Sequence, residues 1–158
     1  MGIPFDSVDK EYIKKPRKWE TQSIKSFMAY MGPLSSVFDI LCFAIMWWVI
    51  KANTVALSPL FQCGWFVFGT VSQVLVIHMI RTAKIPFLQS NPSMPLFLST
   101  FIVAVVALVT GFTDVAIGLD MHRLPLAFIP WLVVILAGYL LCVQLVKKMY
   151  VRRYGEWM

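Results

Sequence analysis

Charged residues, histidines and cysteines are all scarce in this chain of 158 residues. Only 14% of the residues are charged, where a soluble domain usually has about 25%, and there are 2 histidines and 3 cysteines. Cys42, Cys63 and Cys142 lie far from one another and from His122, so no zinc or redox spacing exists. Also lacking are a glycine-rich phosphate loop, a Ser/His/Asp or Cys/His set, and a polar stretch long enough for a nucleotide-binding domain. We therefore expect this chain to bind no cofactor and to hydrolyse no ATP unaided.

Hydrophobic residues make up 59% of the chain and gather into four long runs. Each run is near the roughly 20 residues that a helix needs to cross a bilayer. Because an open-chain segment satisfies its own backbone groups in hydrocarbon only as a helix, the sequence predicts an all-α, polytopic membrane protein with four transmembrane helices. A basic leader, residues 1–26, precedes this membrane domain of residues 27–158, which ends in a short tail. The helices are expected near residues 27–50, 61–80, 95–112 and 128–146.

Prolines are expected to mark the beginnings of three helices. Pro33, Pro95 and Pro130 each fall in or next to a first helical turn of a predicted helix. A proline costs little there, because the first N–H groups of a helix have no partner within the helix. The sequence therefore predicts a helix start close to each of them.

The basic residues are divided unequally between the two sides of the predicted helices. Of the 14 lysines and arginines, 12 lie in the leader, the second loop or the tail, and only Lys51 and Arg123 lie in the first and third loops. By the positive-inside rule, both termini and the second loop are cytoplasmic. The formal charge of +6 is then expected to contact the lipid bilayer or a cytoplasmic domain, and no nucleic acid.

Asp39 lies near the middle of the first run, where a carboxylate costs roughly 2.5 to 3.5 kcal/mol on the membrane-insertion scale. Gly32, Ser35 and Ser36 precede it at helical spacing, so the four residues form a stripe expected to face protein. Asp39 could be an ion ligand or proton carrier, or a hydrogen-bond acceptor that fixes helix packing. The second interpretation is favoured, because a divalent cation needs several oxygen ligands and the runs offer no second carboxylate.

The second run has a comparable seam of small and polar residues. Gly69, Ser72 and Gln73 fall within about one helical turn, and Gln62 lies two turns earlier. Gln73 could offer a carbonyl oxygen to a cation or bond a neighbouring helix, and the packing role is favoured. His78, at the end of the same run, is interpreted as an interfacial residue.

The third run carries small residues at the spacing that permits helices to approach closely. They occur in the pairs Thr100 with Ala104 and Ala107 with Gly111. The spacing recurs widely in membrane helices, so it predicts close packing without naming a partner.

Several segments, taken together, resemble magnesium-transporting P-type ATPases. The resemblance extends over nearly the whole chain and matches the C-terminal end of that family. The segments are DKEYIKKPRKW (9–19), GPLSSVFDI (32–40), FQCGWF (61–66), SQVLVIHMIRT (72–82), KIPFLQS (84–90), LPL (124–126), PWL (130–132) and RYG (153–155).

The resemblance implies that the four helices correspond to the last four of the pump. Mg²⁺ would be the transported ion, and ATP would act in the preceding part, which in such pumps carries the phosphorylated aspartate of the DKTGT motif and most ion ligands. The partner would be that N-terminal portion, with six helices and the cytoplasmic domains, in the plasma (inner) membrane. By the same analogy, Arg17 and Trp19 of the leader would belong to a coupling loop.

Two functions follow as hypotheses. In the first, the chain is a non-catalytic transmembrane support segment of such a pump, either as a gene fragment or as a polypeptide that joins a partner. In the second, it is an autonomous four-helix membrane protein that acts as a regulatory subunit or an ATP-independent carrier. The favoured hypothesis is the support segment.

Overall fold

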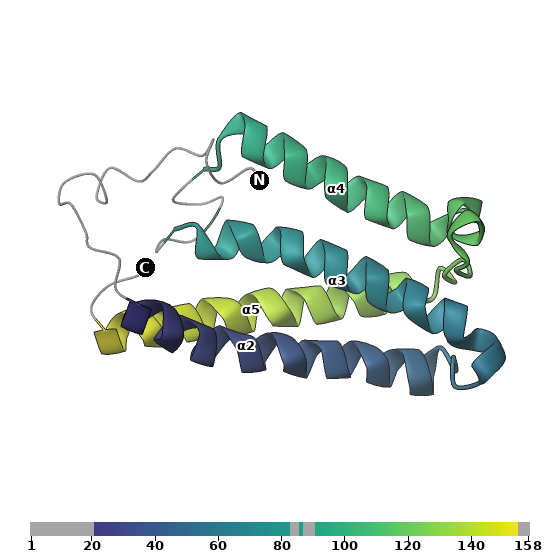
Figure 1. Ribbon diagram of the computed structural model, residues 1–158, viewed down its shortest axis with the longest axis horizontal. Coiled ribbons are helices and arrows are strands. Elements are labelled where there is room, and N and C mark those ends of the chain that lie inside the picture. The colour runs from purple at the N-terminus through teal and green to yellow at the C-terminus, as the bar shows by residue number, and fades with distance from the viewer. Residues whose placement is uncertain (1–20, 83–85, 87–90, 155–158) are drawn as a thin grey trace.

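The computed structural model describes residues 21–82, 86 and 91–154, and four long helices dominate this part of the chain (Figure 1). Each helix is long and apolar enough to cross a membrane, so the prediction of an all-α chain with four membrane-spanning helices is confirmed. The helices are α2 (Thr21–Ala44), α3 (Ser58–Ile80), α4 (Met94–Phe112) and α5 (Phe128–Tyr154).

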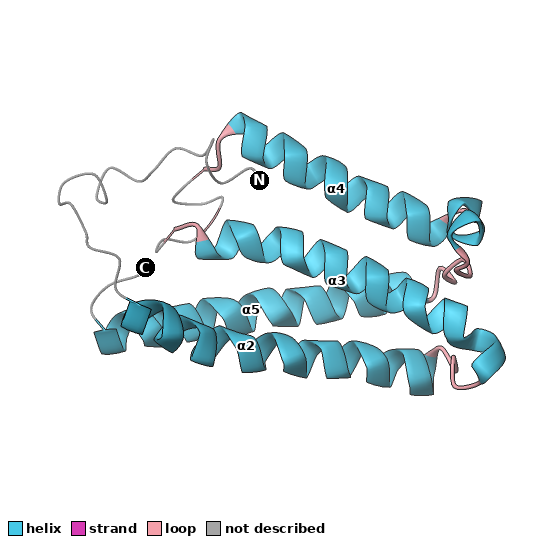
Figure 2. Ribbon diagram, in the orientation of Figure 1, coloured by secondary structure: helices cyan, strands magenta, loops and turns pink. Residues whose placement is uncertain are grey.

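Short helical turns extend the long helices at one end of the bundle (Figure 2). A π-helical turn, Ile45–Val49, continues α2, a 3₁₀ turn, Val55–Leu57, leads into α3, and a second 3₁₀ turn, Asp114–Leu119, follows α4. These turns form part of the α2–α3 and α4–α5 connections, and both connections lie at this end of the bundle (Figure 1).

Two helices run beyond the hydrophobic runs that predicted them. Helix α2 already begins at Thr21, and α5 continues through its basic residues to Tyr154. A helix needs hydrophobic residues only where it crosses hydrocarbon, so polar and basic residues can continue it into the interface. Residues 21–26, assigned to the leader from the sequence, thus belong to α2, and residues 1–20 lie outside the described part.

The expectation that Pro33 starts a helix was wrong, because Pro33 lies inside α2. The Ser35 and Ser36 hydroxyls donate to the carbonyl oxygens of Met31 and Gly32, at 3.4 and 3.3 Å, in the turns around this proline. Side-chain hydroxyls and neighbouring helices allow membrane helices to tolerate an internal proline. Pro95 does stand at the start of α4.

Helices α2, α3 and α5 enclose the core, while α4 packs mainly against the outer side of α3 (Figure 1). Cys42 of α2, Met46 of the π-helical turn that continues it, and Cys63 and Val67 of α3 are fully buried in this core. Phe128 at the start of α5 is buried with them. The core is thus built from apolar side chains of three helices.

Helices α3 and α4 approach closely at the small residues predicted for this purpose. Thr100, Ala107 and Gly111 of α4 are buried. A Cβ atom added to Gly111 would overlap the Val67 side chain of α3 and press on Leu124. Only glycine therefore fits at this crossing without a shift of Val67.

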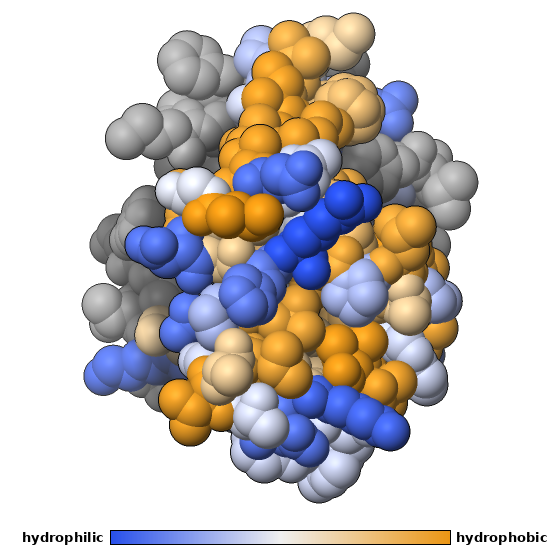
Figure 3. Space-filling view, turned by 90° about the vertical axis from the view of Figure 1, so that its right-hand side faces the viewer, coloured by the Kyte–Doolittle hydropathy of each residue, from blue (hydrophilic) through white to orange (hydrophobic). Residues whose placement is uncertain are grey.

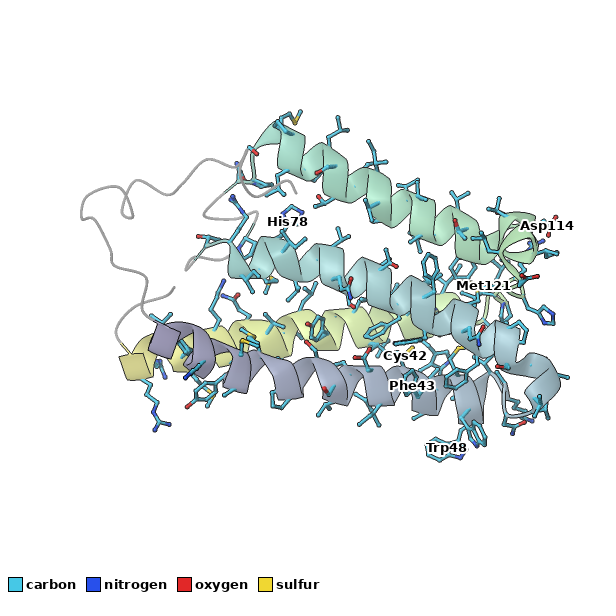
Figure 4. All side chains as sticks on the ribbon, viewed as in Figure 1. Cys42, Phe43, Trp48, His78, Asp114 and Met121 are labelled. Atoms are coloured by element: carbon cyan, nitrogen blue, oxygen red, sulfur yellow. The ribbon has the colours of Figure 1, made fainter. Side chains whose placement is uncertain are left out.

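Large hydrophobic side chains cover much of the outer surface of the bundle. Phe101 and Val106 of α4 are more than half exposed, and Trp48, at the end of the α2 extension, is 73% exposed and points away from the helices (Figure 4). The end that carries the two connections shows hydrophilic residues among hydrophobic ones (Figure 3). Such a surface suits a multi-pass protein whose sides meet lipid or other helices.

Candidate functional site

The polar residues of α2 and α3 meet at one cleft, which we call the open cleft. It has a volume of about 630 Å³ and lies where α2, α3 and α5 converge, with Met121 from the α4–α5 connection at one side. Two stripes predicted separately from the sequence therefore contribute to the same space. The polar side chains and the glycine that line it are Ser35, Asp39, Gln62, Gly69, Thr70, Ser72, Gln73 and Tyr139.

Asp39 supplies the charge of the open cleft. It is half-buried, and it lies near the midpoint of the α2 membrane span, Met28–Val49. In the part of the chain that the structure describes, its carboxylate forms no hydrogen bond and no ion pair. The lining residues include no lysine, arginine or histidine. A carboxylate at that depth costs roughly 2.5 to 3.5 kcal/mol, and the described residues leave this cost uncompensated.

Three hydroxyl groups of the open cleft already have hydrogen-bond partners. The Ser35 and Tyr139 hydroxyls lie 2.9 Å apart and share a hydrogen bond that joins α2 to α5. Phe38 packs on the Tyr139 ring, with 5.2 Å between ring centroids. On α3, the Ser72 hydroxyl donates to the Gly69 carbonyl oxygen at 3.0 Å. These groups fix the walls of the cleft and leave Asp39 as the one charged acceptor there without a partner among the described residues.

The two glutamine amides of α3 are more accessible than the hydroxyl of Ser72. Gln62 and Gln73 are both exposed, and neither forms a hydrogen bond with any residue in the described ranges. They stand about 16 Å apart along the helix, at 1.5 Å per residue. Beside them, a Cβ atom added to Gly69 would meet nothing within 4 Å. This side of α3 therefore has both room and hydrogen-bonding capacity for another helix.

The remaining predicted residues lie elsewhere. Gly32 and Ser36 are exposed on α2 and do not line the open cleft, and a Cβ atom at Gly32 would meet nothing within 4 Å. Their packing role stays a prediction. Arg17 and Trp19 fall outside the described residues.

The open cleft offers little to a metal ion by itself. Asp39 is its only carboxylate, and the described residues contain no group of three or more His, Cys, Asp or Glu side chains that could hold a metal. Mg²⁺ prefers octahedral oxygen ligands and keeps several of its waters. Asp39 and the Gln73 amide oxygen could at most contribute to a site completed by other groups.

Lys147 has a role that the sequence did not reveal. Its side chain is only 1% exposed, and its Nζ atom donates to the Met79 and Thr82 carbonyl oxygens, both at 3.1 Å. These carbonyls lie at the end of α3, where a helix has unsatisfied acceptors and a partial negative charge. Lys147 thus joins α5 to α3. Tyr139, Val143 and Lys147 recur at four-residue spacing on a buried face, which is the signal that could have identified it.

His78 lies in the last turn of α3, near the expected interface, but its ring does not face headgroups or water as the sequence suggested. The ring is buried, and its Nε2 atom lies 2.9 Å from the Thr100 hydroxyl of α4 (Figure 4). The Thr100 hydroxyl can also donate to the Leu96 carbonyl oxygen at 2.8 Å. The histidine therefore joins α3 to α4. The signal was present in the α4 sequence, because Thr100 belongs to the face of small residues.

Comparison with known proteins identifies the type of membrane region. The sequence profile of the family described as "Cation transporting ATPase, C-terminus" matches residues 1–149. The chain is 52% identical over 155 residues to the "Magnesium-transporting ATPase, P-type 1" of Escherichia coli (strain K12), and 50% identical over the same length to that of Salmonella typhimurium (strain 14028s / SGSC 2262). A second relative of that description, from strain LT2 of Salmonella typhimurium, is 44% identical over 157 residues. These alignments cover 98% to 99% of this chain but 17% of each relative.

Proposed function

The chain belongs to the family of cation-transporting ATPase C-terminal regions, and from this membership we propose that it is a transmembrane support segment of a magnesium-transporting P-type pump. In this role it contributes to the ion-translocating membrane domain and takes no part in ATP hydrolysis. Since the chain spans only 17% of the length of these relatives, the remaining helices and the cytoplasmic domains would come from the rest of the pump.

The open cleft is the observation that carries this proposal. A self-contained membrane protein would pair or bury the carboxylate at mid-span, because hydrocarbon cannot solvate it. Here the described residues give Asp39 no partner, and Gln62 and Gln73 are exposed beside it. Further helices packed over this side would remove all three side chains from lipid. The chain therefore has the surface of one part of a larger membrane domain.

The charge distribution supports an orientation for the segment. The start of α2, the end of α3, the start of α4 and the end of α5 lie at one end of the bundle (Figure 1). Of the 14 basic residues of the sequence, 12 belong to this side by their place in the chain. We infer a multi-pass segment of the plasma (inner) membrane with both termini cytoplasmic. The leader, with Arg17 and Trp19, would then face the cytoplasmic domains as a coupling loop.

Magnesium enters this proposal as cargo rather than as a resident ion. One carboxylate and neutral amide oxygens cannot replace the hydration shell of Mg²⁺. The principal ligands and the ATP site would therefore lie in the preceding part of the pump. Asp39 and Gln73 would touch the ion only as auxiliary oxygen ligands.

A chimeric pump tests the proposal directly. The corresponding C-terminal region of the Escherichia coli relative is replaced by this chain, and ATP-dependent Mg²⁺ uptake is measured in membrane vesicles. We expect uptake with the chimera and none with a pump that ends before this region, because the transport helices would lose their lateral support. The chain alone, reconstituted in liposomes, should not move Mg²⁺.

Two outcomes would contradict the proposal. One is a chimera that reaches the membrane in normal amounts but shows neither Mg²⁺ uptake nor Mg²⁺-stimulated ATPase activity. The other is Mg²⁺ uptake by the chain alone, which would identify it as an autonomous carrier. An unchanged amount of chimera in the membrane is the control that separates loss of function from loss of expression.

A further inference from the structure

We propose that the open cleft receives one membrane-spanning helix from the preceding part of the pump, and that this helix places a hydrogen-bond donor or a cationic side chain opposite Asp39. This inference rests on the proposed function, since it names the partner of the same surface. It adds the site of contact, its depth in the membrane and the chemistry of the partner side chain.

The composition of the open cleft defines what the partner must provide. Ser35 is occupied with Tyr139, and Ser72 is occupied with the Gly69 carbonyl oxygen. Asp39 remains as an acceptor, and none of the lining residues is cationic. A carboxylate in hydrocarbon is stabilised by a cation or by strong donors. The complementary group is therefore a donor at the depth of Asp39.

The shape of the same surface fits a helix. Gln62 and Gln73 are three turns apart on α3, with Gly69 between them and no atom near the position of its missing Cβ. A surface of small residues flanked by amides allows two helices to approach and to exchange hydrogen bonds. The opening is therefore long enough for several turns of an adjoining helix.

Other occupants satisfy these residues less well. An acyl chain fills space but offers no donor to a carboxylate or an amide. In a symmetric pair of this chain, the open cleft of one copy would face the open cleft of the other, which would place two Asp39 carboxylates against each other. A helix from elsewhere in the pump avoids both problems, and the relatives carry most of their length outside the region that matches this chain.

Site-specific photocrosslinking in the complete pump tests the contact. A diazirine-bearing amino acid replaces Gln73 in the chimera described above, and the membranes are irradiated, digested and analysed by mass spectrometry. The matched control carries the same probe at Val106, which is 57% exposed on α4, a helix that contributes no lining residue to the cleft. We expect position 73 to crosslink to a peptide of the preceding part of the pump, and position 106 to crosslink to lipid.

Variants of Asp39 test the predicted chemistry. Asp39→Asn retains an oxygen acceptor, so the peptide crosslink should persist. Asp39→Leu removes the acceptor, and the yield should fall roughly threefold or more, the factor that an interhelical hydrogen bond supplies in a membrane. Peptides recovered from the crosslink should contain a Lys, Arg, Asn, Gln, Ser, Thr, Tyr, Trp or His side chain at the level of Asp39.

Crosslinks from position 73 to lipid alone, or to a second copy of this region, would overturn the inference. So would an equal peptide yield from the Asp39→Leu variant. Mg²⁺ uptake is measured in parallel on the chimera that keeps Gln73 and Asp39, so an active pump with one of these crosslinking results would refute the contact and leave the proposed function intact. An inactive pump that still gives the peptide crosslink would refute the function and leave the contact.

Discussion

Two polar regions of this bundle are built in opposite ways. At the end where α3 stops and α4 begins, His78 bonds Thr100, and Lys147 bonds the Met79 and Thr82 carbonyl oxygens. We call this region the closed end. In the open cleft, by contrast, the described residues offer Asp39 no partner. Polar groups at the closed end join α3 to α4 and to α5, whereas Asp39 in the cleft has no such partner among the described residues.

Paired and unpaired polar groups affect the stability of the isolated chain in opposite ways. A polar group paired within the chain contributes to the stability of the chain itself. An unpaired one lowers that stability and is compensated only when a partner arrives, so it favours assembly. Substitutions at the closed end should therefore change unfolding of the isolated chain, and substitutions of the unpaired side chains in the open cleft should not.

The largest effect is expected from Lys147→Met. The substitution keeps much of the side-chain volume but leaves two buried carbonyl oxygens without their ammonium donor. We expect the free energy of unfolding to fall by about 3 kcal/mol, as for loss of buried, charge-assisted hydrogen bonds. Unfolding of the chain in detergent micelles, followed by circular dichroism, measures this change.

The neighbouring Lys148 provides the control, because its side chain is exposed. Lys148→Met removes the same charge from the same turn of α5 and should leave the unfolding midpoint nearly unchanged. Equal losses for the two variants would show that the charge, and not the buried bonds of Lys147, stabilises this end.

A second comparison uses two glycines. Gly111→Ala should lower the free energy of unfolding by about 1 to 2 kcal/mol, since overpacking against Val67 costs more than the better helix propensity of alanine returns. Gly69→Ala should leave it unchanged or raise it slightly, because the new methyl group meets no atom of the chain. Thermal unfolding of both variants in the same micelles gives the two values, and similar losses would contradict the distinction between a packed and an open glycine.

A smaller effect is expected from Thr100→Val, which retains the shape of the side chain but removes the hydroxyl that bonds His78. The expected loss is about 0.6 to 1 kcal/mol, the usual scale of one interhelical hydrogen bond in a membrane protein. The control is Ser99→Ala on the exposed side of α4, where the hydroxyl bonds only its own helix through the Leu96 carbonyl oxygen. If both variants unfold at the same denaturant concentration, the His78 contact contributes nothing measurable.

The sequence predicted the number of helices well, because crossing hydrocarbon requires a long apolar run wherever a helix spans it. It predicted the helix ends less well, since basic residues such as Arg152 and Arg153 continue α5 without adding hydrophobicity. The positive-inside pattern does not place Lys147, because a basic residue near a helix end satisfies it whether exposed or buried, so only the four-residue spacing from Tyr139 and Val143 indicates a buried face. That Asp39 and Gln73 line one cleft depends on the rotation of α2 relative to α3, which is set by packing between helices and not by either sequence segment alone.

The smallest effect on the isolated chain is expected at its only mid-span carboxylate. Asp39→Asn should change the free energy of unfolding by less than about 0.5 kcal/mol, because no hydrogen bond or ion pair with a described residue is lost. A slight gain is compatible with removal of a costly charge from hydrocarbon. The measurement is the same unfolding curve used for Lys147→Met, and a loss comparable to that variant would mean that the chain itself pairs Asp39. A near-zero value, beside the large effect of Lys147, would show that one polar region of the bundle stabilises the isolated chain and that the other does not, as expected for a surface completed by further helices.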